Sequence, residues 1–142
     1  MPPLLRNGLA LLAGLVIGGA VNMALVTLGP VLVPPPPGFD MTSAESLRES
    51  IHLLEWRHLM MTFLAHALGT FVGAWVAGRL AATHQTALAL GVGAFFLLGG
   101  IAASYMFPAP AWFIALDLIV AYIPMAWLAA PRQRATVAPV GW

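Results

Sequence analysis

Residues 59–80 read LMMTFLAHALGTFVGAWVAGRL, an apolar stretch whose interior contains one ionisable ring, that of His66. An α-helix needs roughly 20 predominantly apolar residues to cross the hydrocarbon core of a bilayer. Three further stretches meet this requirement, at 9–30, 86–107 and 111–130. Helices are the expected form, because backbone amides in hydrocarbon must find their hydrogen-bond partners within the segment. The sequence therefore predicts an all-α fold, a four-helix transmembrane bundle.

The composition points to lipid as the solvent and excludes several kinds of site. Of the 142 residues, 61% are hydrophobic and 8% are charged, whereas an ordinary soluble domain carries about 25% charged residues. The chain has no cysteine, which excludes disulfides and thiolate metal sites. Its net charge of +1 gives no electrostatic footprint for nucleic acid. The lipid bilayer is therefore the expected partner.

The first apolar stretch follows Arg6 and has to be distinguished from a signal peptide. The apolar core of a signal peptide has about 7–15 residues. Here the apolar run continues to Val33, which is too long for such a core. We therefore expect a true membrane span.

The arginines predict the orientation of the chain. With both termini inside, the inner segments carry four arginines and no acid: Arg6, Arg79, Arg132 and Arg134. The segment between the first two spans then lies outside and carries two arginines, Arg48 and Arg57. It also carries four acids, called here the outer acidic segment: Asp40, Glu45, Glu49 and Glu55. Since basic residues are enriched on the cytoplasmic side of membrane proteins, we expect both termini in the cytoplasm.

An amphipathic helix is expected over about 43–56, in the outer connection between the first two spans. Thr42 and Glu45 have the spacing of a capping box, with Thr42 as the N-cap. Three apolar residues recur at helical spacing and form one face: Leu47, Ile51 and Leu54. Such a helix lies on the membrane surface or caps the bundle.

The fourth span contains Pro124, which has no N–H to donate and is expected to kink the helix. Residues 131–142 are expected to form a cytoplasmic tail. Residues 1–130 would then form a single transmembrane domain.

Small residues recur every four positions in three of the spans. In lipid, helices associate through close approach at such residues. The second span has one row: Ala65, Gly69, Gly73 and Ala77. The first span has another: Gly14, Gly18 and Asn22. The third span has a row that includes an aromatic residue: Gly91, Phe95, Gly99 and Ala103. Packing within the chain is the expected use of these rows, and a homo-oligomer or a partner membrane subunit is the alternative.

Three strongly polar side chains lie well inside the spans: Asn22, His66 and Asp117. Counted from the outer ends of their spans at 1.5 Å per residue, they lie roughly 8–12 Å deep, in one layer. A charged carboxylate at this depth costs several kcal/mol unless it is paired, and His66 is its expected partner. Thr70 belongs to the same polar stripe as His66, and two further residues are outer candidates: Tyr122 and Ser104.

Two interpretations of this polar layer stay open. Its side chains form a structural clasp that fixes the helix register, or they line an outward-facing pocket that binds a ligand or moves a proton. An unfilled volume beside His66 and Asp117 would favour the pocket. Direct contact in a closed core would favour the clasp.

A weak metal candidate consists of His52, Glu55 and His58, which recur every three residues. Neighbouring pairs at this spacing share one side of a helix. A solvated helix face is the expected role of these residues, because a zinc site needs a more complete set of ligands. No metal or other cofactor is predicted.

Several stretches together resemble a family of short, uncharacterised bacterial membrane proteins with four spans. These stretches are GGAVNMALV, PPPPGFDMTSAESL, FLAHALGTFVGA, GGIAASYMFPAPAWF and LDLIVAYIPMAW. They cover most of the chain up to about residue 128. The resemblance implies a multi-pass protein of the bacterial cytoplasmic (inner) membrane, and it implies no activity, ligand or catalytic residue.

Three functions are compatible with these features. The preferred one is binding or transport of a small lipophilic or cationic ligand, with the outer acidic segment attracting cations. Its pocket would be formed by five residues: Asn22, His66, Thr70, Asp117 and Tyr122. The second is a non-catalytic accessory or oligomer-forming subunit. The third is an intramembrane enzyme in which His66 and Asp117 transfer a proton.

Overall fold

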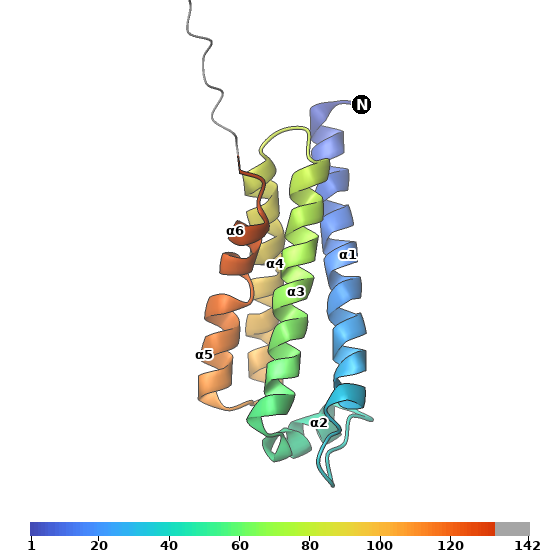
Figure 1. The fold of residues 1–142 in the computed structure, drawn as a ribbon, viewed down its shortest axis with the longest axis vertical. Coiled ribbons are helices and arrows are strands. Elements are labelled where there is room, and N and C mark those ends of the chain that lie inside the picture. The colour runs from blue at the N-terminus through green and yellow to red at the C-terminus, as the bar shows by residue number, and fades with distance from the viewer. Residues whose placement is uncertain (133–142) are drawn as a thin grey trace, which may run out of the picture.

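A computed structural model describes residues 1–132 as a bundle of four long apolar spans with a short helix across one end (Figure 1). In chain order the elements are α1 (Pro3–Leu32), α2 (Ala44–Ser50), the 3₁₀ turn η1 (Ile51–Leu53), α3 (Trp56–Leu80), α4 (Gln85–Met106), α5 (Ala111–Val120) and α6 (Ile123–Ala129). The fourth span consists of α5 and α6. All four spans are long and apolar enough to cross a membrane, which confirms the predicted fold class. Most of the predicted tail, including Arg134, lies outside the described residues.

The helix with the most extensive packing in the bundle is α3, which packs against α1, α4, α5 and α6 (Figure 1). The N-terminus and the end of α6 lie at one end of the bundle, and α2 lies at the other. This arrangement follows from an even number of spans joined by connections at alternating ends. The end of the bundle that carries α2 is therefore opposite the end that carries the N-terminus and the last residues of α6.

The rows of small residues predicted on the first two spans form the contact between α1 and α3. A Cβ atom added to Gly14 would lie 2.5 Å from the carbonyl oxygen of Gly73 and 2.8 Å from the Cβ atom of Ala77. A Cβ atom added to Gly18 would lie 2.6 Å from the carbonyl oxygen of Gly69. Only glycine lets the two backbones approach so closely. These rows are therefore occupied within the chain.

The packing face predicted for the third span is wrong. A Cβ atom added to Gly99 would meet nothing within 4 Å, and Phe95 is 58% exposed. The packing face of α4 instead contains Gly93 and Gly100, where an added Cβ atom would lie 2.6 Å from Ala126 and 2.5 Å from the Tyr122 hydroxyl, respectively. The reason is that Ala126 of α6 and Tyr122, which precedes α6, need space beside α4. The exposed ring of Phe95 can instead face lipid.

The interior of the bundle is built from small side chains, and large apolar side chains cover its outside. One core cluster consists mainly of alanine: Ala74, Ala77, Ala89, Val92, Ala126 and Ala129. Large apolar residues are exposed on every span: Leu12, Val16, Leu68, Leu98, Ile119 and Trp127. An exposed apolar surface of this extent would be unstable in water. In a bilayer it faces the lipid chains.

The first helix begins well before the predicted range of 9–30, because polar side chains anchor its first turns. The side-chain oxygen of Asn7 accepts hydrogen bonds from the backbone N–H groups of Ala82 (2.9 Å) and Thr83 (3.2 Å). Arg6 donates from Nε to the last carbonyl of α3, at 2.9 Å. These bonds connect the start of α1 to the α3–α4 connection.

The amphipathic helix is shorter than the predicted 43–56, and its N-cap is Ser43 rather than Thr42. The Ser43 hydroxyl accepts a hydrogen bond from the backbone N–H of Ser46, at 3.0 Å. The backbone N–H of Thr42 instead donates to a carboxylate oxygen of Asp40, at 2.8 Å. This bond lowers the pKa of the Asp40 carboxyl below its ordinary value. A local turn at Asp40 thus moves the helix start by one residue.

Candidate functional site

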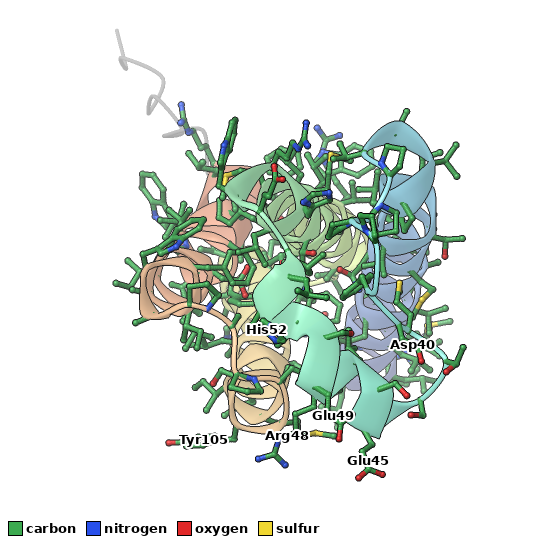
Figure 2. All side chains as sticks on the ribbon, turned by 90° about the horizontal axis from the view of Figure 1, so that it is seen from below. Asp40, Glu45, Arg48, Glu49, His52 and Tyr105 are labelled. Atoms are coloured by element: carbon green, nitrogen blue, oxygen red, sulfur yellow. The ribbon has the colours of Figure 1, made fainter. Side chains whose placement is uncertain are left out.

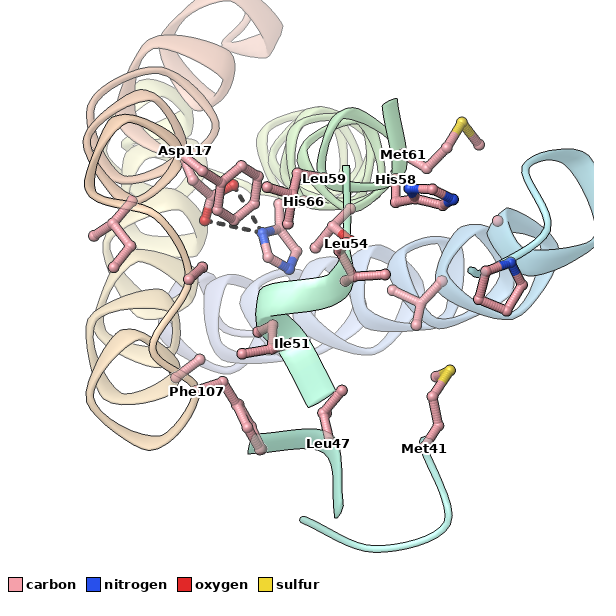
Figure 3. Close-up of a pocket in the computed structure, with 18 of the residues that line it drawn as sticks. Met41, Leu47, Ile51, Leu54, His58, Leu59, Met61, His66, Phe107 and Asp117 are labelled. Atoms are coloured by element: carbon pink, nitrogen blue, oxygen red, sulfur yellow. Dashed lines mark hydrogen bonds and ion pairs between the residues drawn. The ribbon is translucent and has the colours of Figure 1, made fainter. Parts of the chain in front are cut away.

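A cavity of about 350 Å³ lies at the end of the bundle that α2 covers (Figure 3). Its wall takes residues from all four spans, from α2 and η1, and from the connection between α1 and α2. The wall is apolar apart from five side chains: His58, Thr62, His66, Ser104 and Asp117. Within residues 1–132, no arginine lines it. Its volume lies in the range typical of small-molecule sites.

The predicted apolar face of the amphipathic helix forms the wall that closes this cavity at the α2 end of the bundle. Its residues all line the cavity: Leu47, Ile51 and Leu54. Figure 3 shows them on the side facing the long helices. The charged side chains of α2, including Glu45, Arg48 and Glu49, are exposed, and Figure 2 shows them pointing away from the bundle. The helix therefore separates the apolar cavity from the polar surroundings.

His66 and Asp117 contact each other directly at the wall of the cavity. The Nδ1 atom of His66 lies 2.8 Å and 3.0 Å from the two carboxylate oxygens of Asp117 (Figure 3). The hydroxyl of Tyr122 donates to the same carboxylate, at 3.0 Å. The side chain of Asp117 is 7% exposed and that of His66 is 23% exposed. The carboxylate is thus enclosed, while part of the imidazole remains open.

These contacts determine which nitrogen of His66 is available to a ligand. Because Nδ1 faces a carboxylate that also accepts from Tyr122, the proton belongs on Nδ1, and in the neutral ring Nε2 then carries a lone pair. Among residues 1–132, no protein group forms a hydrogen bond with Nε2. Figure 3 shows this second nitrogen turned away from Asp117, on the side of the cavity where Ile51 lies.

Tyr122 reaches Asp117 because the fourth span is interrupted. The span breaks between Val120 and Ile123, and Pro124 cannot donate to the carbonyl of Val120 one turn before it. The ring of Tyr122 stacks on that of His66, with centroids 5.8 Å apart. Gly100 makes room for it, since an added Cβ atom would lie 2.5 Å from the hydroxyl. The structure thus confirms the predicted kink and shows that it positions Tyr122.

Asn22 and Thr70 are not part of this cluster. Neither residue lines the cavity, and neither forms a hydrogen bond with His66 or Asp117 within the described part of the chain. Asn22 packs against Gly69, because a Cβ atom at Gly69 would lie 2.8 Å from that of Asn22. Thr70 is 1% exposed. The structure therefore does not bring Asn22 and Thr70 into the cluster of His66, Asp117 and Tyr122.

The three residues of the weak metal candidate, His52, Glu55 and His58, have different roles in the structure. The backbone N–H of Glu55 donates to Nδ1 of His58, at 3.1 Å, and Nε2 of His58 then donates to the carbonyl of Pro34, at 2.9 Å. Both ring nitrogens of His58 are thus engaged with backbone groups, and His52 is exposed. Across residues 1–132, no three histidine, cysteine or acidic side chains converge in a way that could hold a metal ion.

The outer acidic segment lies outside the cavity. None of its four acids contributes to the cavity wall within the described residues. Glu55 forms an exposed ion pair with Arg57, at 3.0 Å. Asp40 closes the turn before α2, where its backbone N–H donates to the Ser50 hydroxyl, at 3.0 Å. These acids shape the outer connection and its surface charge.

Two features of the site were not predicted from the sequence: His58 connects the outer connection to α3, and Gly100 accommodates Tyr122. Thr62, which the sequence places in the same polar stripe as His66 and Thr70, lines the cavity one turn before His66. One signal was present for Gly100, which follows Gly93 by two helical turns and so shares its face. The hydrogen bond from His58 to a carbonyl distant in the sequence had no such signal.

Comparisons of the chain with protein-family models, with curated proteins and with solved structures found no match. The resemblance to a bacterial four-span family therefore gains no support beyond its coarser part. That part is four helices long and apolar enough to cross a membrane.

Proposed function

We propose that this multi-pass membrane protein binds a small lipophilic molecule in the cavity beneath α2, with His66 as the polar anchor. The observation that carries the proposal is an apolar cavity of about 350 Å³ beside an imidazole nitrogen that has no hydrogen-bond partner among residues 1–132. A clasp alone would need the His66–Asp117 contact but no adjoining space. Here the His66–Asp117 contact lies beside an open cavity, so we interpret the contact as orienting His66 toward a ligand.

The chemistry of the wall favours a lipophilic ligand over a cationic one. Both oxygens of Asp117 already have partners, His66 and Tyr122, and the carboxylate is almost enclosed. A cation in this apolar cavity would lose its hydration without gaining a free carboxylate, which costs several kcal/mol. Apolar surface buried in the cavity instead contributes about 25 cal/mol per Å².

We further propose that the cavity lies on the outer side of a bacterial cytoplasmic membrane. The described arginines of the opposite end, Arg6, Arg79 and Arg132, are at the ends of spans away from α2. An inward position for them agrees with the usual distribution of basic residues. The ligand would then reach the site from the outer leaflet or from outside the cell.

A second candidate, an intramembrane enzyme, rests on the same contact between His66 and Asp117. A carboxylate that orients an imidazole is a common arrangement for proton transfer. The accessory-subunit alternative loses its specific surface, because the rows on α1 and α3 pack against each other. We prefer binding, because the cavity supports it without assigning a reaction.

The proposal is tested by filling the cavity. Ala103 lines it, whereas Ala102 is exposed on the same helix, so Ala103→Phe and Ala102→Phe form a matched pair. The protein in liposomes is photolabelled with a fatty alcohol that carries a diazirine on its tail, with unlabelled 1-dodecanol as competitor. We expect competable labelling of cavity residues in the wild type and in Ala102→Phe, and its loss in Ala103→Phe. Equal labelling of the two variants would contradict a cavity site.

A further inference from the structure

We infer that the ligand is a neutral lipophilic molecule whose head group donates a hydrogen bond, such as a long-chain alcohol, and that Nε2 of His66 accepts this bond. The inference rests on the proposed function and specifies the ligand of the same site. It follows from the polar groups that remain available at the cavity, because His66 and Ser104 offer acceptors, whereas His58 and Asp117 already have protein partners.

His66 supplies the first acceptor. Its Nδ1–H is directed at Asp117, with the two oxygens at 2.8 Å and 3.0 Å. The Tyr122 hydroxyl also donates a hydrogen bond to that carboxylate, at 3.0 Å. In neutral His66 the remaining nitrogen, Nε2, therefore presents a lone pair toward the cavity.

Two further acceptors belong to residues that line the cavity. The hydroxyl of Ser104 donates its proton to the carbonyl of Ile101, at 2.7 Å, which leaves its lone pairs free. Pro30 lies inside α1 and has no N–H, so the carbonyl of Val26 lacks its helical donor. Val26, Pro30 and Ser104 all line the cavity.

The carbonyl of Val26 lies near the level of His66. The antiparallel contact places Gly69 beside Asn22 and Met61 beside Gly29. Interpolation along the two helices brings Val26 level with the turn that holds His66. Acceptors therefore occur on α1 and α3 at one depth.

Most hydrogen-bond donors at the cavity already have a protein acceptor. The remaining proton of His58 is directed at the carbonyl of Pro34, at 2.9 Å, and the prolines of the wall have no N–H. Thr62 is the exception, since its hydroxyl can donate or accept. A ligand that offers only acceptors would leave Nε2 desolvated and unpaired, which is costly in an apolar site. A ligand with a hydroxyl satisfies it.

The inference is tested with three competitors that share a 12-carbon tail: 1-dodecanol, dodecyl methyl ether and dodecylammonium. Each displaces the photoreactive alcohol from the wild-type protein in liposomes, at equal concentrations in the membrane. We expect the alcohol to compete at about tenfold lower concentration than the ether, which lacks a donor. The ammonium ion should compete less well than the alcohol.

The possible outcomes separate the two proposals. Competition by the ether at the same concentration as the alcohol, or stronger competition by the ammonium ion, would overturn the donor inference and leave the cavity site intact. Labelling that no competitor displaces would instead contradict the proposed function. His66→Phe keeps a ring without nitrogen and should remove the preference for the alcohol. The wild-type comparison stands by itself if that variant fails to fold.

Discussion

At the residue scale, the carboxylate of Asp117 lies inside a span and accepts hydrogen bonds from two side chains that belong to different segments. His66 comes from α3, and Tyr122 comes from the break between α5 and α6. Hydrogen bonds to a charged group contribute about 1.5–3 kcal/mol each, because losing one leaves the charge under-solvated. The cluster therefore stabilises the fold and orients His66 at the same time.

Removing the Tyr122 hydroxyl tests this dual role. Tyr122→Phe should lower the free energy of unfolding by about 1.5–3 kcal/mol, as measured by denaturant titration in mild detergent. The chain's other tyrosine, Tyr105, is 83% exposed and provides the control. Tyr105→Phe should change stability by less than about 0.5 kcal/mol. Equal effects of the two substitutions would contradict the assigned hydrogen bond.

The pairing of His66 with Asp117 was predictable from the sequence, and the position of Asn22 was not. Both members of the pair lie at similar depth, and an unpaired charge there is costly. Counting from Pro30 underestimates the depth of Asn22, because α1 continues through that proline to Leu32. Asn22 consequently packs beside Gly69, three residues beyond His66, or about 4.5 Å deeper.

At the element scale, the α1–α3 contact depends on the face of each glycine rather than on glycine content. Gly18 and Gly19 are neighbours in the sequence, but a Cβ atom at Gly18 would lie 2.6 Å from a carbonyl oxygen, whereas one at Gly19 would meet nothing within 4 Å. One residue thus packs against α3, and the other faces away from the protein.

Alanine substitutions at this pair should have opposite effects on unfolding. Gly18→Ala should destabilise the protein by about 1–3 kcal/mol, because the two backbones must separate. Gly19→Ala should be neutral or stabilising by up to about 1 kcal/mol, because alanine favours the helix. Denaturant titration of both variants checks this. Destabilisation by Gly19→Ala, or none by Gly18→Ala, would contradict the packing.

The packing faces of α1 and α3 were predictable from the spacing of small residues, and the packing face of α4 was not. On α1 and α3 the rows of small residues are uninterrupted and face each other. On α4 the predicted row includes Phe95, and the contacting face is marked only by Gly93 and Gly100. Four-residue spacing alone does not reveal which of two small-residue faces will meet a partner.

At the scale of the whole molecule, hydropathy and span length determine most of the fold, which is why it was predictable. The cavity was not, because its wall combines residues that are distant in the sequence. For example, the cavity is lined by Leu25 on α1, Leu47 on α2 and Phe107 after α4. No local sequence pattern predicts such a cavity, because its size depends on how far the long helices separate next to α2.

Orientation is also a property of the whole molecule, and it can be tested because the chain has no cysteine. Glu45 is exposed at the end that carries α2, and Ala82 is exposed at the other end. In intact spheroplasts, a membrane-impermeant maleimide should label Glu45→Cys but label Ala82→Cys only after permeabilisation. The reverse pattern would place α2 and the cavity on the cytoplasmic side.

The most direct test of the ligand site is a structure of the protein in lipid with 12-bromododecanol, in which anomalous scattering locates the bromine. We expect a hydroxyl within about 2.7–3.2 Å of Nε2 of His66. We also expect the apolar tail to occupy the cavity beside Leu47 and Ile51. Bromine sites confined to the lipid-facing surface, with side chains filling the cavity, would contradict this expectation and leave His66 as a structural clasp.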